Sequence, residues 1–182
     1  MLELGCGSGA NLALAMAYEW RVTGVDLVAQ ALADARFNLG QTARLIEADL
    51  ARGLPPEISG GFDAVMIPNL LCYLTRTQAR VLLRALRDCV QPGAEVFVRT
   101  RTPDDHRCGR GDEIEPLTWR LRTQETGESG LINCFYEPAE LADLLQETLG
   151  LSAPTIMAAR FDNPQCGVMV GNADVIIWGE AS

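Results

Sequence analysis

Short apolar runs alternate along the chain with segments in which apolar residues recur every three or four positions. This alternation is typical of an α/β domain with a mainly parallel sheet. The predicted strands are residues 1–4, 21–26, 43–48, 62–67, 95–101, 152–161 and 173–179. The predicted helices are residues 10–18, 29–39, 76–90 and 137–149.

Local signals set several of these boundaries. Thr75 is a suitable N-cap for the third helix, and Pro92 with Gly93 predicts that this helix ends near residue 90. Residues 102–134 do not follow the alternation, so we interpret them as an insertion, with a hairpin at 117–121 and 131–136. Residues 162–172 are rich in turn-forming side chains and are expected to join the last two strands as a loop.

Composition narrows the class of protein. A length of 182 residues predicts one domain, and 48% hydrophobic residues are enough for a packed core. The formal charge of −9 argues against nucleic acid and anionic membranes as partners. All 15 basic residues are arginine, which excludes Schiff-base chemistry and a P-loop lysine.

The six cysteines are irregularly spaced and form no CxxC motif. No run approaches the ~20 apolar residues of a membrane span. No signal peptide is recognisable, so we expect a cytoplasmic protein with reduced thiols. Asp104, His106 and Cys108 lie on one loop without a second cluster of ligands, and we therefore expect no metal site.

The clearest motif is Leu-Glu-Leu-Gly-Cys-Gly-Ser-Gly at residues 2–9. A strand, a Gly-x-Gly-x-Gly turn and a helix start form a crevice in which backbone N–H groups can approach a nucleotide. Asp26 ends the second predicted strand, 21 residues after Gly5, and Asp49 follows the third strand. Each feature alone is also compatible with an ordinary turn or helix cap, but together they favour a site at the carboxyl ends of neighbouring strands.

These motifs resemble those of class I S-adenosylmethionine-dependent methyltransferases. Residues 2–9 resemble the first motif of that family, 24–27 the acidic second and 47–50 the third. Residues 62–65 with 68–74 resemble the fourth motif, and 91–94 resemble the turn before the fifth strand.

The resemblance implies an α/β Rossmann-like three-layer sandwich, with a seven-stranded, mostly parallel sheet and an antiparallel last strand pair. It covers nearly the whole chain, 1–182, as a single methyltransferase domain. Relatives usually carry a helical segment ahead of the first strand, which we expect to be absent here because the chain begins within that strand.

The resemblance also implies S-adenosylmethionine as cofactor, with S-adenosylhomocysteine as product. Glu3 would steer the methionine ammonium, Asp26 would bind the ribose hydroxyls, and Asp49 with Leu50 would bind the adenine. The remaining residues expected at the cofactor are Gly5, Cys6, Gly7, Gly9, Asn11, Leu27, Pro68 and Asn69. Of these, Pro68 and Asn69 would lie by the methionine moiety and the acceptor.

The sulfonium already activates the methyl group, so transfer depends mainly on positioning the acceptor, and a general base is optional. We interpret residues 102–134 as a candidate substrate lid. His106 and Tyr73 are the catalytic candidates, and Arg107, Arg110 and Tyr136 are the candidates for acceptor binding. The competing interpretations are that His106 is a solvated loop residue and that Arg107 and Arg110 belong to a solvated charge run. For Tyr73 and Tyr136 the competing interpretation is an aromatic residue of the core.

We expect methyl transfer to a small molecule by in-line displacement, and we leave a homodimer open. Two alternatives remain at this point. An NAD(P)-dependent oxidoreductase would use Gly5, Gly7, Ala10 and Asp26 in the same way, although Gly9 and Asp49 then lack a role. A truncated, non-catalytic domain would bind the cofactor or a partner chain without turnover.

Overall fold

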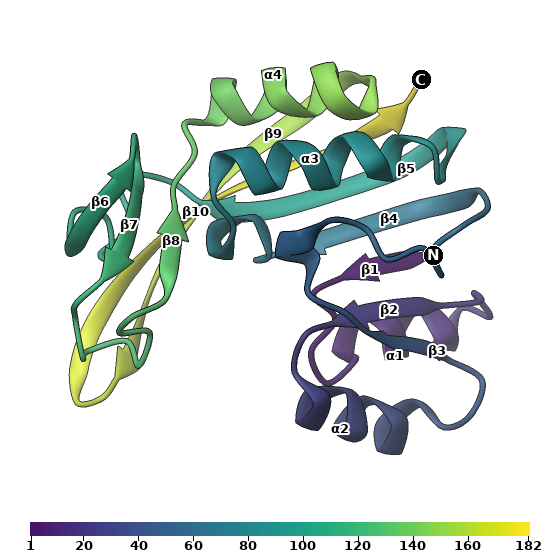
Figure 1. The fold of residues 1–182 in the computed structure, drawn as a ribbon, viewed down its shortest axis with the longest axis horizontal. Coiled ribbons are helices and arrows are strands. Elements are labelled where there is room, and N and C mark those ends of the chain that lie inside the picture. Colours follow the sequence, from purple (N-terminus) through teal and green to yellow (C-terminus); the bar gives the residue numbers. More distant parts are fainter.

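The computed structural model describes residues 1–182, with ten strands, four α-helices and two short 3-10 helices (Figure 1). The main sheet contains β1 (Leu2–Leu4), β2 (Thr23–Asp26), β3 (Arg44–Glu47), β4 (Phe62–Pro68), β5 (Val90–Arg101), β9 (Leu151–Gln165) and β10 (Val168–Ala181). A small second sheet contains β6 (Gly111–Glu115), β7 (Thr118–Leu121) and β8 (Ile132–Cys134). The helices are α1 (Ala10–Ala17), α2 (Ala29–Leu39), η1 (Leu50–Arg52), η2 (Leu71–Tyr73), α3 (Arg76–Arg87) and α4 (Pro138–Leu149).

The main sheet has the strand order β3-β2-β1-β4-β5-β10-β9. Strands β1 to β5 are parallel, whereas β10 is antiparallel to both of its neighbours, β5 and β9. This confirms the predicted Rossmann-like fold with seven strands and an antiparallel last pair. Parallel neighbours need crossover connections, and the helices supply them.

Helices pack on both faces of the sheet. Val25 of β2 belongs to the larger apolar cluster, which includes the leucines of α3 and α4, whereas its neighbour Gly24 faces Leu12 of α1. Successive residues of a strand point to opposite faces, so α1 lies on the face opposite α3 and α4. A smaller cluster joins α1 to α2 through Leu12 and Leu32.

Helix α3 begins as predicted and ends earlier than predicted. The Thr75 hydroxyl accepts a hydrogen bond from Gln78 N, and the Gln78 side chain accepts one from Thr75 N, which together form a capping box. The predicted end at residue 90 is wrong, because Val90 already pairs with Phe62 of β4. Pro92 and Gly93 therefore lie in β5, in a stretch where its register with β4 shifts, and not in a turn after the helix.

The prediction of a loop over residues 162–172 is also wrong. Strands β9 and β10 stay paired up to Gln165 and Val168, so the turn contains only Cys166 and Gly167. The side chain of Asn172 donates to the Asn163 carboxamide oxygen at 2.8 Å, so two polar side chains of this segment bind each other across the paired strands. The hairpin continues past the end of β5 as an arm (residues 161–173), seen in yellow beside the second sheet in Figure 1.

The insertion folds as a three-stranded antiparallel sheet in the order β6-β7-β8. The predicted hairpin is present as β7 and β8, with Thr118 opposite Cys134, but β6 was not predicted. Its sequence, Gly-Asp-Glu-Ile-Glu, is mostly charged and exposed, so it lacks the apolar alternation that marks a strand. No helix of the structure is long and apolar enough to cross a membrane.

Candidate cofactor and acceptor site

The cofactor candidates lie where β1, β2, β3 and β4 end. These strands are neighbours in the sheet, and parallel strands have their carboxyl ends at the same edge. The motifs at residues 2–9, 24–27, 47–50 and 68–74 therefore converge, although they are separated in the sequence. This edge is where ligands bind in open α/β sheets.

The glycine loop bends back onto the end of β2. Gly5 N and Cys6 N both donate to the carbonyl oxygen of Val25, at 2.8 and 3.1 Å. Gly5, Gly7 and Gly9 have φ values of 76°, 52° and 83°, in the left-handed region that disfavours residues with a side chain. The loop can therefore present its backbone to a ligand only with glycine at these positions.

Asp26 is bound to this loop directly. One carboxylate oxygen accepts from Gly7 N at 2.7 Å and the other from Val28 N at 2.9 Å. The carboxylate is thus fixed beside the glycine loop, and it keeps lone pairs for a ligand hydroxyl because each oxygen can accept more than one bond. Leu27 is 60% exposed next to it, where its side chain can contact a ligand.

Glu3, which was expected at the cofactor, is a carboxyl group only 1% exposed on a central strand. Its Oε1 accepts from Asn11 Nδ2 at 2.7 Å, and its Oε2 is buried without a hydrogen-bond partner. Burial raises the pKa of Glu3 to about 7, opposed by the Asn11 hydrogen bond and reinforced by the Asp26 charge. An unpartnered buried carboxylate oxygen fits a cationic ligand group such as an ammonium.

Cys6 lies inside the loop as an apolar residue. Burial raises the pKa of its thiol to about 12, so the thiol stays neutral. A Cβ on Gly24 would come within 2.7 Å of the Cys6 sulfur and of Leu12 Cδ1, which explains why only glycine fits below the loop. Cys6 therefore supports the loop by packing, and its carbonyl oxygen accepts a hydrogen bond from Gly9 N at 2.9 Å.

Asp49 caps the short helix that follows β3. Its Oδ1 accepts from Ala51 N at 3.0 Å, and its Oδ2 lies 3.4 Å from Nε of Arg52. Leu50 is 4% exposed and belongs to the main core. The pair thus offers one half-exposed carboxylate and a fixed backbone at the sheet edge, next to the strand that ends in Asp26.

The end of β4 brings the fourth motif against the glycine loop. Asn69, which follows Pro68, has a left-handed φ of 56°, and its N–H donates to Arg99 O at 2.8 Å. A Cβ on Gly5 would lie 3.4 Å from Leu70 Cβ, so the two loops touch. Tyr73 N donates to Leu70 O at 2.9 Å, which places Tyr73 one turn further on.

The candidates for acceptor binding are judged by their burial and by the hydrogen bonds that their side chains already make. Arg107 is buried, and its guanidinium binds Asp105, Glu128, Asn172 and Gln165. It has little donor capacity left for an anionic acceptor, and because it is buried it is not part of a solvated charge run either. Tyr136 is 1% exposed within the main core, and Arg76 lies over its ring at 5.0 Å.

His106 and Arg110 share one partner. The His106 Nε2 atom lies 2.7 Å from Glu125 Oε2, and Arg110 donates to the same oxygen at 3.1 Å. His106 N donates to Gly171 O of the arm at 3.0 Å. The pair is therefore grouped on the second sheet and the arm, in a cluster separate from the glycine loop.

Two residues that the sequence did not single out, Arg101 and Glu128, bind Tyr73. The Tyr73 hydroxyl donates to Glu128 Oε1 at 2.6 Å, and Arg101 donates to the same oxygen at 2.8 Å. Glu128 lies 55 residues from Tyr73 in the chain. No local motif links them, so only the tertiary structure reveals this cluster.

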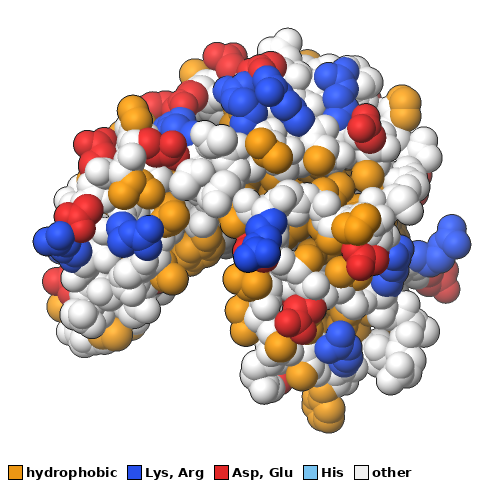
Figure 2. Space-filling view, viewed as in Figure 1, with side chains coloured by type: hydrophobic (Ala, Val, Ile, Leu, Met, Phe, Trp, Pro, Cys, Tyr) orange, Lys and Arg blue, Asp and Glu red, His pale blue; other side chains and the backbone are white.

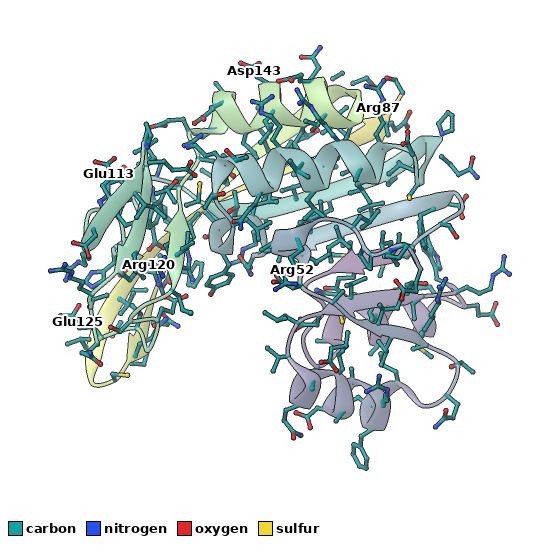
Figure 3. All side chains as sticks on the ribbon, viewed as in Figure 1. Arg52, Arg87, Glu113, Arg120, Glu125 and Asp143 are labelled. Atoms are coloured by element: carbon teal, nitrogen blue, oxygen red, sulfur yellow. The ribbon has the colours of Figure 1, made fainter.

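Figure 2 shows a hollow between the second sheet with the arm and the half of the molecule that contains β1 to β3. Figure 3 places Arg52 on one side of this hollow, and Arg120 and Glu125 on the other. No group of three or more His, Cys, Asp or Glu side chains is arranged to hold a metal ion. The labelled side chains that border the hollow are therefore charged, two arginines and one glutamate.

Comparison with known proteins agrees with this geometry. Residues 1–93 match a family described as "Methyltransferase domain". The ribosomal protein L11 methyltransferase of Thiobacillus denitrificans is 38% identical over 88 residues, which are 48% of this chain and 28% of that protein. The chain thus spans about a quarter to two fifths of the length of the curated relatives it matches.

Solved structures share the fold over the whole chain. A methyltransferase of Methanosarcina mazei has a TM-score of 0.76 at 20% identity and covers 100% of this chain and 92% of its own. DhpI, solved with S-adenosylhomocysteine, has a TM-score of 0.65 at 20% identity and covers 100% and 76%. At this level of identity, these similarities show that the fold is shared.

The fold, the glycine loop and the acidic residues at the strand ends define a class I methyltransferase domain. The chain belongs to the S-adenosylmethionine-dependent methyltransferase family. This membership also decides against the NAD(P)-dependent oxidoreductase considered from the sequence, because the glycine loop that both interpretations use lies within the matched methyltransferase domain.

Proposed function

We propose that the protein transfers a methyl group from S-adenosylmethionine to a small-molecule acceptor in the hollow beside the glycine loop. The observation that carries this proposal is the pair of acids at the loop. Asp26 is fixed by Gly7 N at 2.7 Å, and Glu3 retains one unpartnered buried oxygen. A ribose with two hydroxyls and a methionine with an ammonium match these acceptors.

The residues at the strand ends divide the binding task. Asp26 would accept from the ribose hydroxyls, with Leu27 exposed beside it. Glu3, oriented by Asn11, would accept from the ammonium, and the loop from Gly5 to Gly9 would lie along the methionine. Asp49 and Leu50 would bind the adenine from the next strand, while Pro68 and Asn69 would border the acceptor.

The cofactor, when bound, supplies a methyl group that the sulfonium already activates. The chain's own residues must then hold the acceptor in line with the departing sulfur and exclude water. Positioning of this kind can lower the barrier by about 7–11 kcal/mol. A general base is optional for this transfer, which agrees with the lack of lysine and with a single histidine in the sequence.

A small molecule is the acceptor that we favour, because the acidic chain disfavours nucleic acid and the hollow is bordered by an arm and a folded lid. A protein acceptor is the second candidate. It is supported by the matched relatives, which are named ribosomal protein L11 methyltransferases. We further propose a cytoplasmic setting, since all six cysteines are free thiols, and a homodimer stays open.

Two experiments test the proposal in sequence. Calorimetric titration with S-adenosylhomocysteine should show binding, while NAD, the control ligand, should not bind. The protein is then incubated with methyl-tritiated S-adenosylmethionine and either the small-molecule filtrate or the protein fraction of a bacterial lysate. We expect enzyme-dependent label in the filtrate.

The outcomes separate the candidates. Label confined to the protein fraction would replace the small-molecule acceptor with a protein acceptor. Binding of S-adenosylhomocysteine without transfer to either fraction would favour the non-catalytic domain considered from the sequence. Asp26→Ala serves as the matched negative control in every incubation.

A further inference from the structure

A carboxylate of the insertion lies between two arginines and the phenol of Tyr73. Glu128 Oε1 accepts from the Tyr73 hydroxyl at 2.6 Å and from Arg101 at 2.8 Å, while Oε2 accepts from Nε of Arg107. The side chains of Glu128 and Arg101 are only 11% and 12% exposed. Both carboxylate oxygens are thus used, in a cluster that is largely shielded from water.

The same cluster holds the surrounding elements together. Arg107 also donates to Asp105 at 3.0 Å and to Asn172 of the arm at 3.1 Å. Arg101, at the end of β5, donates to Asn133 of β8. The sheet edge, the insertion and the arm therefore converge on Glu128, and each arginine is matched by a buried acid, as buried charges require.

Tyr73 is the member of the cluster that reaches the candidate acceptor side. It lies within the fourth motif, and its hydrogen bond to Leu70 connects it to the residue that contacts Gly5. The guanidinium carbon of Arg101 lies 5.2 Å from the centre of the Tyr73 ring. Tyr73 nevertheless remains 39% exposed, so part of the ring is available to a ligand.

We propose that Glu128 is a positioning residue which, by accepting a hydrogen bond from the Tyr73 hydroxyl, fixes Tyr73 as a neutral wall on the acceptor side of the site. This inference rests on the proposed function and deepens it. Tyr73 would contact the acceptor, and Glu128 would act only through Tyr73. Arg101 and Arg107 keep Glu128 ionised and in place.

The arrangement also removes Tyr73 from the candidates for a general base. Its hydroxyl keeps its proton in the hydrogen bond to Glu128, and burial, with the neighbouring Cys72 and Glu128, raises the pKa of Tyr73 above its ordinary value. The hydrogen bonds from Tyr73 and the two arginines lower the pKa of Glu128. A proton from an acceptor therefore has no favourable path through this pair, and Tyr73 contributes shape and orientation.

Nuclear magnetic resonance of tyrosines labelled with ¹³C at Cζ provides the direct test. The chain has three tyrosines, and Tyr73→Phe assigns the resonance of interest. In the wild type this resonance should stay constant from pH ~7 to ~11. In Glu128→Gln the loss of the acid should shift it already at neutral pH and lower the pKa of Tyr73. Glu125→Gln, which removes a charge from the same segment without touching Tyr73, should leave the resonance unchanged.

A reciprocal measurement guards against a variant that fails to fold. Tyr73→Phe removes one hydroxyl from a half-exposed ring, so folding should persist. The ¹³C resonance of the Glu128 carboxylate should then titrate at a higher pH than in the wild type, because a hydrogen bond that lowers its pKa is lost. Unchanged titration of Glu128 would overturn the coupling.

Kinetics test the role at the acceptor. With the lysate fraction that carries the label, Tyr73→Phe and Glu128→Gln should each reduce single-turnover transfer about 10- to 100-fold, as for a lost hydrogen bond to a charged group. The double variant should be no slower than the slower single variant, and affinity for S-adenosylhomocysteine should stay within about twofold. A double variant whose rate falls by the product of the two single reductions would overturn the proposal.

These readouts separate the two proposals. A wild-type protein that fails to bind S-adenosylhomocysteine would overturn the proposed function, and with it the acceptor role of Tyr73. A Tyr73 resonance that is the same in the wild type and in Glu128→Gln, in protein that binds S-adenosylhomocysteine, would overturn the positioning role alone.

Discussion

The backbone N–H of Gly7 donates to the carboxylate of Asp26 at 2.7 Å. This bond ties the glycine loop to the neighbouring strand through groups of the chain itself. Because the second carboxylate oxygen is held by Val28 N at 2.9 Å, the acid cannot rotate freely. The site is therefore preorganised, and part of the ordering cost is met on folding and not on binding.

Asp26→Ala should weaken binding of S-adenosylhomocysteine by about 1–3 kcal/mol, the range for lost hydrogen bonds to a charged group. The change removes the acceptor for the ribose and releases Gly7 N. Calorimetric titration measures the effect. Asp34→Ala is the matched control, since Asp34 is on the exposed side of α2 and pairs only with Gln30. Equal affinity in wild type and Asp26→Ala would contradict the assignment.

Gly24→Ala should destabilise the protein by about 1–3 kcal/mol, because the new methyl group would lie 2.7 Å from the Cys6 sulfur and Leu12 Cδ1. Cofactor affinity should also fall, since the glycine loop must move to relieve the contact. Urea unfolding and calorimetry measure the two effects. Gly171→Ala is the control: its methyl group would meet only Asp162 Oδ1, at 3.3 Å, and we expect little change in stability.

Glu3 should make stability fall as the pH rises. Its pKa is raised from 4.5 to about 7, so between these values the folded state binds a proton that the unfolded state has lost. The stabilisation is complete below pH ~4.5 and is lost by pH ~7, and a shift of this size corresponds to about 3 kcal/mol. Glu3→Gln should remove this slope in urea unfolding curves recorded across the range.

The same carboxyl group should link cofactor binding to proton release. An ammonium placed beside Glu3 lowers its pKa, so binding near pH ~6.5 should release a fraction of a proton. Calorimetry of S-adenosylhomocysteine in buffers of different ionisation enthalpy measures this release. Its persistence in Glu3→Gln would show that another group is responsible.

Arg107→Ala should be far more damaging than Arg110→Ala. Arg107 is 3% exposed, and its loss would leave Asp105 and Glu128 as uncompensated buried acids, at a cost of about 3–5 kcal/mol. Arg110 pairs with Glu125 on a side chain that is 45% exposed, so its removal should cost about 0–1 kcal/mol. Thermal unfolding compares the two. Similar losses would mean that the Arg107 cluster does not stabilise the fold.

Much of the cofactor edge follows from local sequence. The turn at Gly5–Gly9 requires glycine backbones, Asp26 and Asp49 each end a short apolar run, and Thr75 starts a helix by capping it. Each of these depends on neighbours within a few residues, which is why alternation and motif spacing were enough to predict them. The parallel order of the strands then brings them to one edge.

Errors arose where pairing overrides local preference. Residues 162–165 and 168–172 look like parts of a loop, yet they lie in strands because β9 and β10 pair with each other along this length. Pro92 and Gly93 look like a turn, but they lie in β5 between Val90 and Glu95, which both pair with β4 on either side of a register shift. Charged β6 was missed for the same reason, since it is held by β7 and has no apolar face of its own. The conformational preference of one residue is worth only tenths of a kcal/mol, so continuous hydrogen bonding between paired strands outweighs it.

The sequence by itself determined the fold class, the glycine loop and the acids that follow β2 and β3, because these depend on backbone sterics and on period-two and period-3.6 patterns. Only the tertiary structure decided that Arg107 is buried, that Glu3 keeps an unpartnered oxygen, and that Glu128 binds Tyr73 from 55 residues away. Burial and long-range pairing are properties of the packed chain, since the partners of a buried charge come from segments that no local pattern connects.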